Sequence, residues 1–193
     1  MDIGEIIGAC VAAAFFLCIP VLIIIGTVKT KRYTKKQIES GEDKKIVMNF
    51  ASSIFKQPEL YTFAVGNHIV TETRGRTTTY FYYSYLLAFN QQEFHIVGFK
   101  AVDHKPVYRN IITFDFANMQ LTHKRGKKGL EIDLYMAGQR QHITVTDIVK
   151  GNNSDKSDTP YAIEQTREVQ LLEQMLLQYE ARSYQMQMSA RPQ

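Results

Sequence analysis

The sequence has no tryptophan, and its only two cysteines, Cys10 and Cys18, lie in one apolar stretch near the N-terminus. The rest of the chain therefore contains no thiol for an internal disulfide or a thiolate metal site. The five histidines show neither H-x-H nor H-E-x-x-H spacing, and there is no G-x-S-x-G, P-loop or dinucleotide glycine pattern. These absences predict a protein that is not an enzyme and that holds no metal and no cofactor.

A concentrated basic face is also absent from the body of the chain. The net charge of the 193 residues is +4, and residues 29–45 alone carry seven basic and three acidic side chains. Proteins that bind nucleic acid carry a concentrated basic surface of their own. The charge distribution therefore predicts no nucleic-acid partner.

The longest stretch without a charged side chain runs from Ile6 to Val28. A helix of this length reaches roughly 35 Å, which is enough to cross a hydrocarbon core of about 30 Å. Acidic residues precede the stretch, and no small-residue cleavage site ends it, which is unlike a secretory signal peptide. The sequence predicts a single transmembrane α-helix within residues 1–28. Gly4, Gly8 and Ala12 recur at four-residue spacing and form a candidate helix–helix contact, although small residues are common in membrane helices.

A basic cluster follows this stretch directly. Because Lys and Arg near the membrane end set orientation, we expect the N-terminus outside and the C-terminal domain in the cytoplasm, in a single-pass protein of the cell membrane. The cluster could also contact anionic headgroups, at about 1 kcal/mol per charge near the surface. Its members are Lys29, Lys31, Arg32, Lys35 and Lys36.

Two amphipathic helices are expected to flank a β-rich domain over residues 46–182. The first covers residues 44–56, where Ile46, Phe50 and Ile54 recur at helical spacing after a capping Asp43. The second covers residues 160–182. Residues 29–45 are interpreted as a basic juxtamembrane linker, and residues 183–193 as a flexible tail.

Between these helices the apolar period changes to two, which predicts strands. Gly66-Asn67 is expected to turn a first hairpin within Leu60–Thr73, and Thr77–Phe89 reads as one long strand. The further strands are expected at Glu93–Lys100, Val107–Phe116, Gln120–His123, Leu130–Met136 and His142–Val149. The pattern predicts a mainly-β (α+β) domain with an antiparallel sheet, sandwich or barrel.

Three stretches in this region carry a family resemblance: YLLAFNQQEFHIVGF, YRNIITFDFANMQLTHKRGKKGLEIDLYM, and QHITV followed by the last helix. In the second, an extended segment leads into two strands joined by a polar, glycine-bearing hairpin. Over roughly Leu60–Arg182 the chain resembles the pleckstrin-homology-like (PH-like) domains of bacterial membrane proteins, with an added first hairpin. The resemblance implies an antiparallel PH-like sheet or barrel closed by a C-terminal α-helix, no catalytic residues, and a module that binds lipid headgroups or protein partners, often as an oligomer.

The most concentrated charge of the domain lies in the hairpin HKRGKKG. Cations beside glycines can hold a phosphate or an acidic surface, although charged hairpin tips are usually only solvated. The candidate residues for a lipid or an acidic partner are Lys124, Arg125, Lys127 and Lys128, with a second, weaker corner at Arg74 and Arg76.

Two other groups of side chains have simpler explanations. Glu131 and Asp133 share a strand face and could act as an acid–base pair, but strand alternation with water on one side explains them as well. Most of the tyrosines of the long strand are expected in the core or in cross-strand pairs, with a protein-contact face as the alternative. They are Tyr80, Tyr82, Tyr83 and Tyr85.

Together these patterns predict a membrane-tethered, noncatalytic interaction module that binds a protein partner or anionic lipid headgroups at the inner membrane surface. The expected partners are membrane lipids and a protein partner or further copies of the chain. One alternative is a structural subunit of a larger membrane complex, such as a secretion or conjugation assembly. An enzyme with a pocket inside the barrel ranks last, because no set of catalytic groups stands out.

Overall fold

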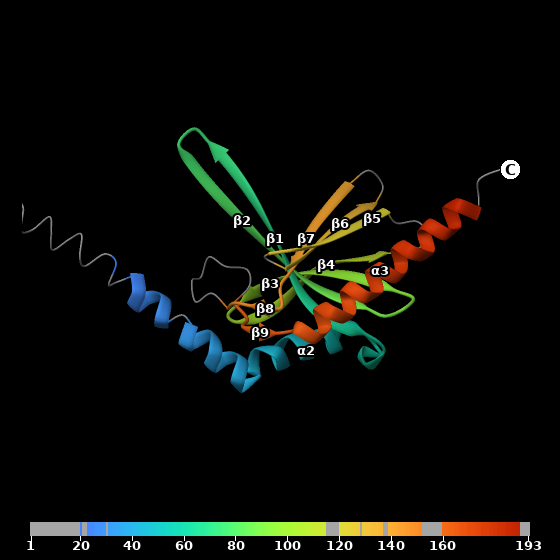
Figure 1. Ribbon diagram of the computed structural model, residues 1–193. Helices are drawn as coiled ribbons and strands as arrows, with labels where there is room; N and C mark the ends of the chain where they lie inside the picture. The colour runs from blue at the N-terminus through green and yellow to red at the C-terminus, as the bar shows by residue number, and fades with distance from the viewer. Residues whose placement is uncertain are drawn as a thin grey trace, which may run out of the picture.

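A seven-stranded antiparallel sheet forms the centre of the protein, with one helix on each of its faces. The computed structural model describes residues 20, 23–29, 31–114, 120–127, 129–136, 139–151 and 160–189. Helical residues 23–29 and 31–40, here called the N-terminal helical segment, precede α2 and extend away from the sheet (Figure 1). The further elements are α2 (Glu42–Ile54), η1 (Pro58–Leu60), β1 (Thr62–Arg74), β2 (Thr77–Phe89), β3 (Phe94–Val102), β4 (Lys105–Phe114), β5 (Gln120–Gly126), β6 (Gly129–Met136), β7 (Gln139–Val145), β8 (Ile148–Val149), β9 (Ile163–Glu164) and α3 (Thr166–Ser189).

The predicted fold class is wrong in two respects. The strand order is β4-β3-β2-β1-β7-β6-β5, so β4 and β5 are the two ends of the sheet and do not pair with each other within the described ranges. The sheet is therefore not a closed barrel, which was one of the forms that we expected. In addition, no helix formed by the described residues combines the length and the apolar composition needed to cross a membrane. Of the predicted transmembrane stretch, residues 6–19, 21 and 22 lie outside the described residues, as do Gly4, Gly8 and Ala12.

The expected turn at Gly66-Asn67 is also absent, because β1 runs straight through it from Thr62 to Arg74. Glycine is required here because β7, which pairs with β1 at this point, lies very close to it: a Cβ on Gly66 would lie 2.6 Å from Cγ2 of Ile143. The glycine therefore reflects a close approach of two strands and not a hairpin. The predicted strand Thr77–Phe89, in contrast, is confirmed at both ends as β2.

The core has two parts, one on each face of the sheet. On one face, Leu172 and Leu176 of α3 pack against Leu87 of β2 and Ile132 of β6. On the other face, α2 and the small β8–β9 sheet cover β1, β2 and β3, with Phe50 packing near Phe99 at 5.6 Å between ring centroids. Both faces of the inner strands are therefore buried, which explains the unbroken apolar end of β2.

The helix α3 begins six residues later than predicted, because Ile163–Glu164 first pairs with Ile148–Val149 as β9. It then continues to Ser189, beyond the predicted end at residue 182. At the other end of the domain, the expected linker is helical over residues 31–40. The chain turns at Gly41, whose N–H donates to the carbonyls of Gln37 and Ile38, and α2 starts immediately afterwards.

The hairpin formed by β1 and β2 is longer than the strands beside it. Its register is unbroken from Thr62↔Phe89 to Arg74↔Thr77, but β7 pairs with β1 only as far as Asn67, and β3 pairs with β2 only as far as Ser84. Residues 68–83, here called the β1–β2 arm, therefore project beyond the sheet (Figure 1). Gly75, with φ of 62°, allows the tight turn at the tip of the arm.

Candidate functional site

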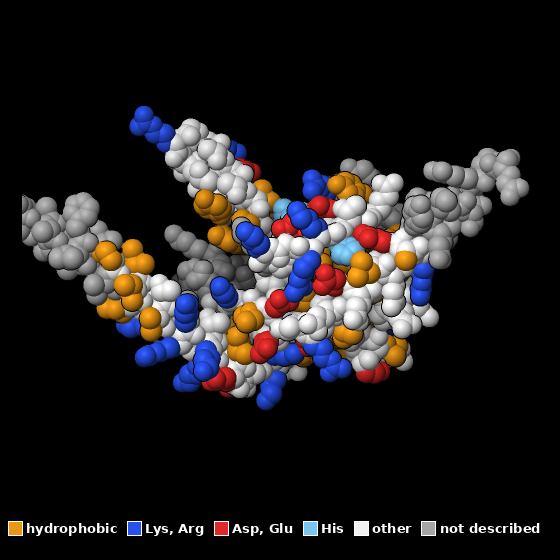
Figure 2. All heavy atoms as spheres, viewed as in Figure 1, with side chains coloured by type: hydrophobic (Ala, Val, Ile, Leu, Met, Phe, Trp, Pro, Cys, Tyr) orange, Lys and Arg blue, Asp and Glu red, His pale blue; other side chains and the backbone are white. Residues whose placement is uncertain are grey.

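The N-terminal helical segment exposes large aliphatic side chains next to the basic cluster. Ile23, Ile24 and Ile25 are 62%, 61% and 47% exposed. All five basic residues predicted to contact a membrane surface are exposed as well. Figure 2 shows Lys and Arg side chains gathered along this segment and the adjoining edge of the molecule. Apolar and basic side chains thus occupy consecutive parts of one helical segment.

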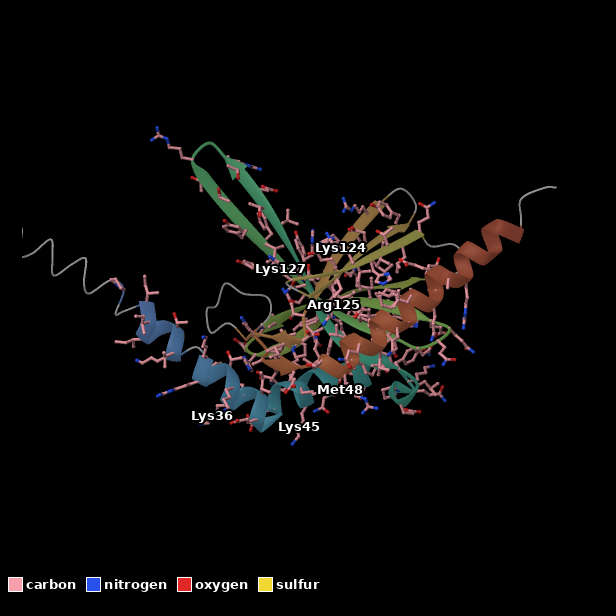
Figure 3. All side chains as sticks on the ribbon, viewed as in Figure 1. Lys36, Lys45, Met48, Lys124, Arg125 and Lys127 are labelled. Atoms are coloured by element: carbon pink, nitrogen blue, oxygen red, sulfur yellow. The ribbon has the colours of Figure 1, made fainter. Side chains whose placement is uncertain are left out.

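Most cations of the basic cluster form no ion pair with the described residues. Lys35 lies 3.7 Å from Glu39, one helical turn further along. Lys29, Lys31, Arg32 and Lys36 have no ion-pair partner within the part of the chain that the structure describes. Their positive charge is therefore available to an external anion. Figure 3 shows Lys36, and Lys45 in α2, pointing away from the body of the protein.

A groove of about 550 Å³ separates residues 27–39 of this segment from the β8–β9 sheet. Its lining includes Lys31 and Lys35 on the helix and Lys150 just after β8, together with the apolar side chains of Ile38 and Ile148. Lys150 thus adds a cation from the β-domain to those of the helix. Two glutamates, Glu39 and Glu164, also line the groove.

The predicted basic corner at HKRGKKG is divided by the structure. Arg125 is bound internally: its guanidinium donates to both carboxylate oxygens of Asp147, at 2.7 and 2.8 Å, and lies 3.7 Å from Glu173 of α3. Lys124 and Lys127 are exposed, and Lys128 lies outside the described residues. Arg125 therefore joins β5 to α3, and two lysines remain available to a partner.

The second predicted corner, Arg74 and Arg76, lies at the tip of the β1–β2 arm. Arg74 is 3.5 Å from Glu72 on the same strand, and both side chains are largely exposed. The tip is well separated from the labelled Lys124 and Lys127 in Figure 3. The two corners therefore do not form one binding site.

Sequence reasoning missed that four of the five histidines lie against carboxylates. Three of these pairs join residues that are distant in sequence or on neighbouring strands, so no spacing pattern could reveal them, whereas His95 and Glu93 are two residues apart. One of these carboxylates belongs to Asp43, which we expected to cap the first amphipathic helix. Asp43 is instead a buried residue within α2, and its carboxylate accepts the Ala162 N–H at 2.7 Å. The pairs are His95–Glu93, His104–Asp43, His123–Glu180 and His142–Asp133.

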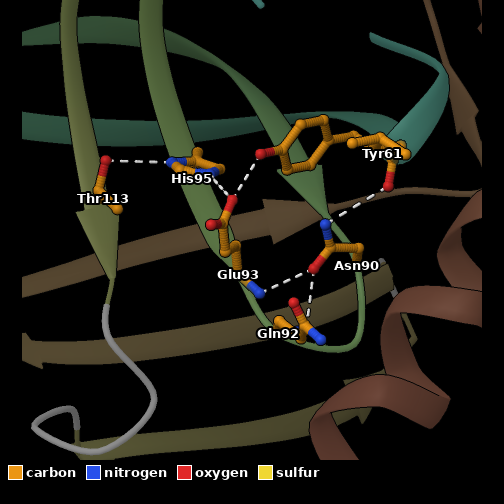
Figure 4. A network of polar contacts seen from close by, with 7 residues as sticks. Tyr61, Asn90, Gln92, Glu93, His95 and Thr113 are labelled. Carbon is orange, nitrogen blue, oxygen red and sulfur yellow. Dashed lines mark hydrogen bonds and ion pairs between the residues drawn. The ribbon is translucent and has the colours of Figure 1, made fainter. Parts of the chain in front are cut away.

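The His95 pair belongs to a polar network that also includes Tyr61 and Thr113 (Figure 4). Nε2 of His95 and the hydroxyl of Tyr61 both lie within hydrogen-bonding distance of Oε2 of Glu93, at 3.0 and 2.5 Å. The bond from Tyr61 lowers the pKa of Glu93, and the bond from His95 lowers it further. Nδ1 of His95 is 3.0 Å from the Thr113 hydroxyl. The network joins Tyr61, which lies between η1 and β1, to the β2–β3 turn, β3 and β4, and none of its residues lines the groove described above.

Asp133 and His142 form another polar cluster, at the base of the arm. Asp133 accepts two hydrogen bonds from Arg140, which hold the pKa of its carboxyl below the usual range. Asp133 therefore pairs with Arg140 and His142. An acid–base pair would require it to pair with Glu131, and the described residues show no such contact. His68 lies against His142, with 5.6 Å between ring centroids, and its buried Nδ1 has no hydrogen-bond partner among the described residues. Burial lowers the pKa of His68, and His142 lowers it further.

No group of three or more His, Cys, Asp or Glu side chains suited to a metal ion occurs among the residues described. Comparisons of the chain find no matching protein family, no matching curated protein and no matching solved structure. The PH-like assignment therefore stays a prediction. The case for a function rests on the surfaces described above.

Proposed function

We propose that this protein is a noncatalytic interaction module that binds anionic lipid headgroups at the inner surface of a cell membrane. The observation that carries this proposal is the N-terminal helical segment, where three exposed isoleucines adjoin four cations that form no ion pair among the described residues. Exposed aliphatic side chains are unfavourable in water, and bulky ones in a row are typical of contact surfaces.

A membrane surface fits both parts of this segment. Each Lys or Arg near an anionic leaflet contributes about 1 kcal/mol, so the four unpaired cations together contribute about 4 kcal/mol. The adjoining isoleucines would enter the boundary between headgroups and acyl chains, as in other helices that bind lipid surfaces. The groove beside Lys150 adds a further cation on the same side of the domain.

The noncatalytic part of the proposal is supported by the positions of the titratable groups. The four histidine–carboxylate pairs lie in different parts of the fold, and three of them connect separate structural elements. The His95–Glu93 pair, which has the Thr113 hydroxyl beside it, shares no residue with the groove. None of the residues of these four pairs lines the groove at Lys31 and Lys150.

The proposal is tested by cosedimentation of the full-length chain with vesicles of phosphatidylcholine, with and without phosphatidylserine. We expect tighter binding when phosphatidylserine is present, and we expect high salt to remove the difference, because it screens charges at a surface. Equal binding to both kinds of vesicle at low salt would show that the basic cluster does not recognise anionic lipid.

A further inference from the structure

The outer half of β2 has an open edge within the part of the chain that the structure describes. Residues 77–83 of β2 pair with β1 on one side, but β3 reaches only to Ser84 on the other side. Unpaired backbone groups along such an edge can bind another strand.

The alternation of antiparallel pairing identifies the backbone groups at this edge. The N–H of Asn90 donates to the Glu93 carbonyl at 3.0 Å, so even-numbered residues of β2 direct their N–H and C=O groups toward β3. The two-residue turn of the hairpin gives the same result from the other end, since Arg74 pairs with Thr77. Beyond the end of β3, Thr78, Tyr80 and Tyr82 therefore direct these groups toward the open edge.

This edge lacks the features that usually prevent strand pairing. Residues 77–83 contain no charged residue and no proline, and their register with β1 has no bulge. The edge strand β4 is different, because it carries Pro106 and a register shift opposite Gly98/Phe99. Exposed edges are normally protected by charges, prolines or bulges. The unprotected edge of β2 is therefore suited to pairing.

The sequence of the edge is complementary to itself. It reads Thr-Thr-Thr-Tyr-Phe-Tyr-Tyr over residues 77–83. If two copies pair in antiparallel orientation about Tyr80, Tyr80 faces its own copy and every threonine faces an aromatic ring. Pairs of β-branched and aromatic residues are favourable across antiparallel strands. The resulting pairs are Thr77–Tyr83, Thr78–Tyr82 and Thr79–Phe81, each formed twice.

We propose that this protein forms a symmetric dimer in which the β2 edges of two arms, residues 77–83, pair in antiparallel orientation about Tyr80. Tyr80, Phe81 and Tyr83 are 57%, 40% and 36% exposed in the single chain, and the dimer covers part of this aromatic surface. Because the same surface is used on both copies, the contact closes as a pair and does not propagate into a fibre. The other side of the arm is less suited to pairing with itself, since β1 carries Glu72 and Arg74.

Disulfide cross-linking tests the register of this dimer. In the full-length chain, solubilised in a neutral detergent, Cys10 and Cys18 are first changed to serine, so that each new cysteine is the only thiol. Facing Cα atoms in such a pair are about 5.5 Å apart, within the range of a disulfide. We expect Tyr80→Cys to give a disulfide-linked dimer as the main product of mild oxidation.

Two single variants provide the matched controls. Thr78→Cys and Tyr82→Cys are each displaced along the strand from their own copies by about 13 Å, so neither should cross-link alone. A mixture of the two variants should cross-link, because residue 78 faces residue 82. This mixture keeps Tyr80, so it also tests the dimer if Tyr80→Cys itself disturbs the arm. Adding Tyr80→Lys to both cysteine variants should abolish the cross-link in their mixture, since two like charges then face each other.

The dimer is contradicted if Tyr80→Cys cross-links no more than Thr78→Cys and the mixture stays monomeric. Cross-linking of Thr78→Cys alone would contradict the register. Both experiments are done without anionic lipid, so their outcome does not depend on the proposed lipid binding.

Discussion

The side chain of Gln165 hydrogen-bonds both backbone groups of Val65, a residue of β1 that lies 100 positions earlier. Its Oε1 accepts the Val65 N–H at 2.7 Å, and its Nε2 donates to the Val65 carbonyl at 2.8 Å. The same Nε2 donates to the carbonyl of Thr146, just after the end of β7. Gln165 is only 2% exposed. The side chain thus takes the place of a strand partner where β7 ends, and it connects the start of α3 to the sheet.

Removal of this side chain should destabilise the protein strongly. Gln165→Ala leaves the two buried backbone groups of Val65 and the partly buried Thr146 carbonyl without this partner, and each buried group costs about 1–3 kcal/mol, so we expect a loss of about 3 kcal/mol in the free energy of unfolding. Urea unfolding followed by circular dichroism measures it. Gln170→Ala, on the exposed side of α3, is the control and should change the free energy by less than about 0.5 kcal/mol. Equal effects of the two substitutions would contradict this role of Gln165.

The divided basic corner predicts different roles for two neighbouring cations. Arg125→Gln removes the paired bond to Asp147 and the contact with Glu173, and we expect a loss of about 1 kcal/mol in stability, as is usual for partly exposed ion pairs. Lys127→Gln should leave the stability unchanged. Urea midpoints of the two variants measure this difference, and an unchanged midpoint in Arg125→Gln would show that Arg125 does not stabilise the fold.

The base of the arm should respond to pH through His68. Because burial and His142 lower the pKa of His68, the unfolded chain takes up a proton at this site before the folded chain does. Its contribution to stability is therefore complete above the ordinary histidine pKa and declines as the pH falls toward the lowered pKa of the folded state. The groups facing His68 are His142, Asp133 and Tyr83.

We expect His68→Phe to weaken the fall in stability between about pH 7 and pH 5, since 6.5 is the ordinary pKa of histidine. Urea midpoints of this variant and of the unmodified protein over that range provide the measurement. The control is His123→Gln, which removes the histidine of β5 that pairs with Glu180. It shows the general effect of losing a histidine. An unchanged pH dependence in His68→Phe would contradict the assignment.

Several elements could be predicted from the sequence because their patterns have a local cause. β2 combines β-branched and aromatic residues with turn residues at both ends, and its bounds match the prediction. The amphipathic helix predicted over residues 160–182 is likewise present as α3, which buries Val169, Leu172 and Leu176. In α3 the apolar spacing alone determines which face is buried.

Other features depend on contacts between distant residues and have no local signal. Gly66 indicated a turn, but glycine is required there because the side chain of Ile143 packs closely against β1. Asp43 suggested a helix cap, whereas its carboxylate binds Ala162, and Arg125 suggested a free cation, whereas Asp147 and Glu173 bind it. The missing closure of the sheet is of the same kind, because it depends on how β4 and β5 lie relative to each other. Local patterns do not contain this information.

The central claim is that the basic cluster beside the exposed isoleucines binds anionic lipid, and a charge-matched pair of variants tests it most directly. Lys29→Gln/Lys31→Gln/Lys36→Gln removes three cations of the cluster, and Lys56→Gln/Lys100→Gln/Lys105→Gln removes three exposed cations elsewhere. At about 1 kcal/mol per charge, we expect the first variant to bind phosphatidylserine-containing vesicles roughly a hundredfold more weakly than the unmodified chain. The second variant should bind as the unmodified chain does. Equal losses in the two variants, or no loss in the first, would contradict the account.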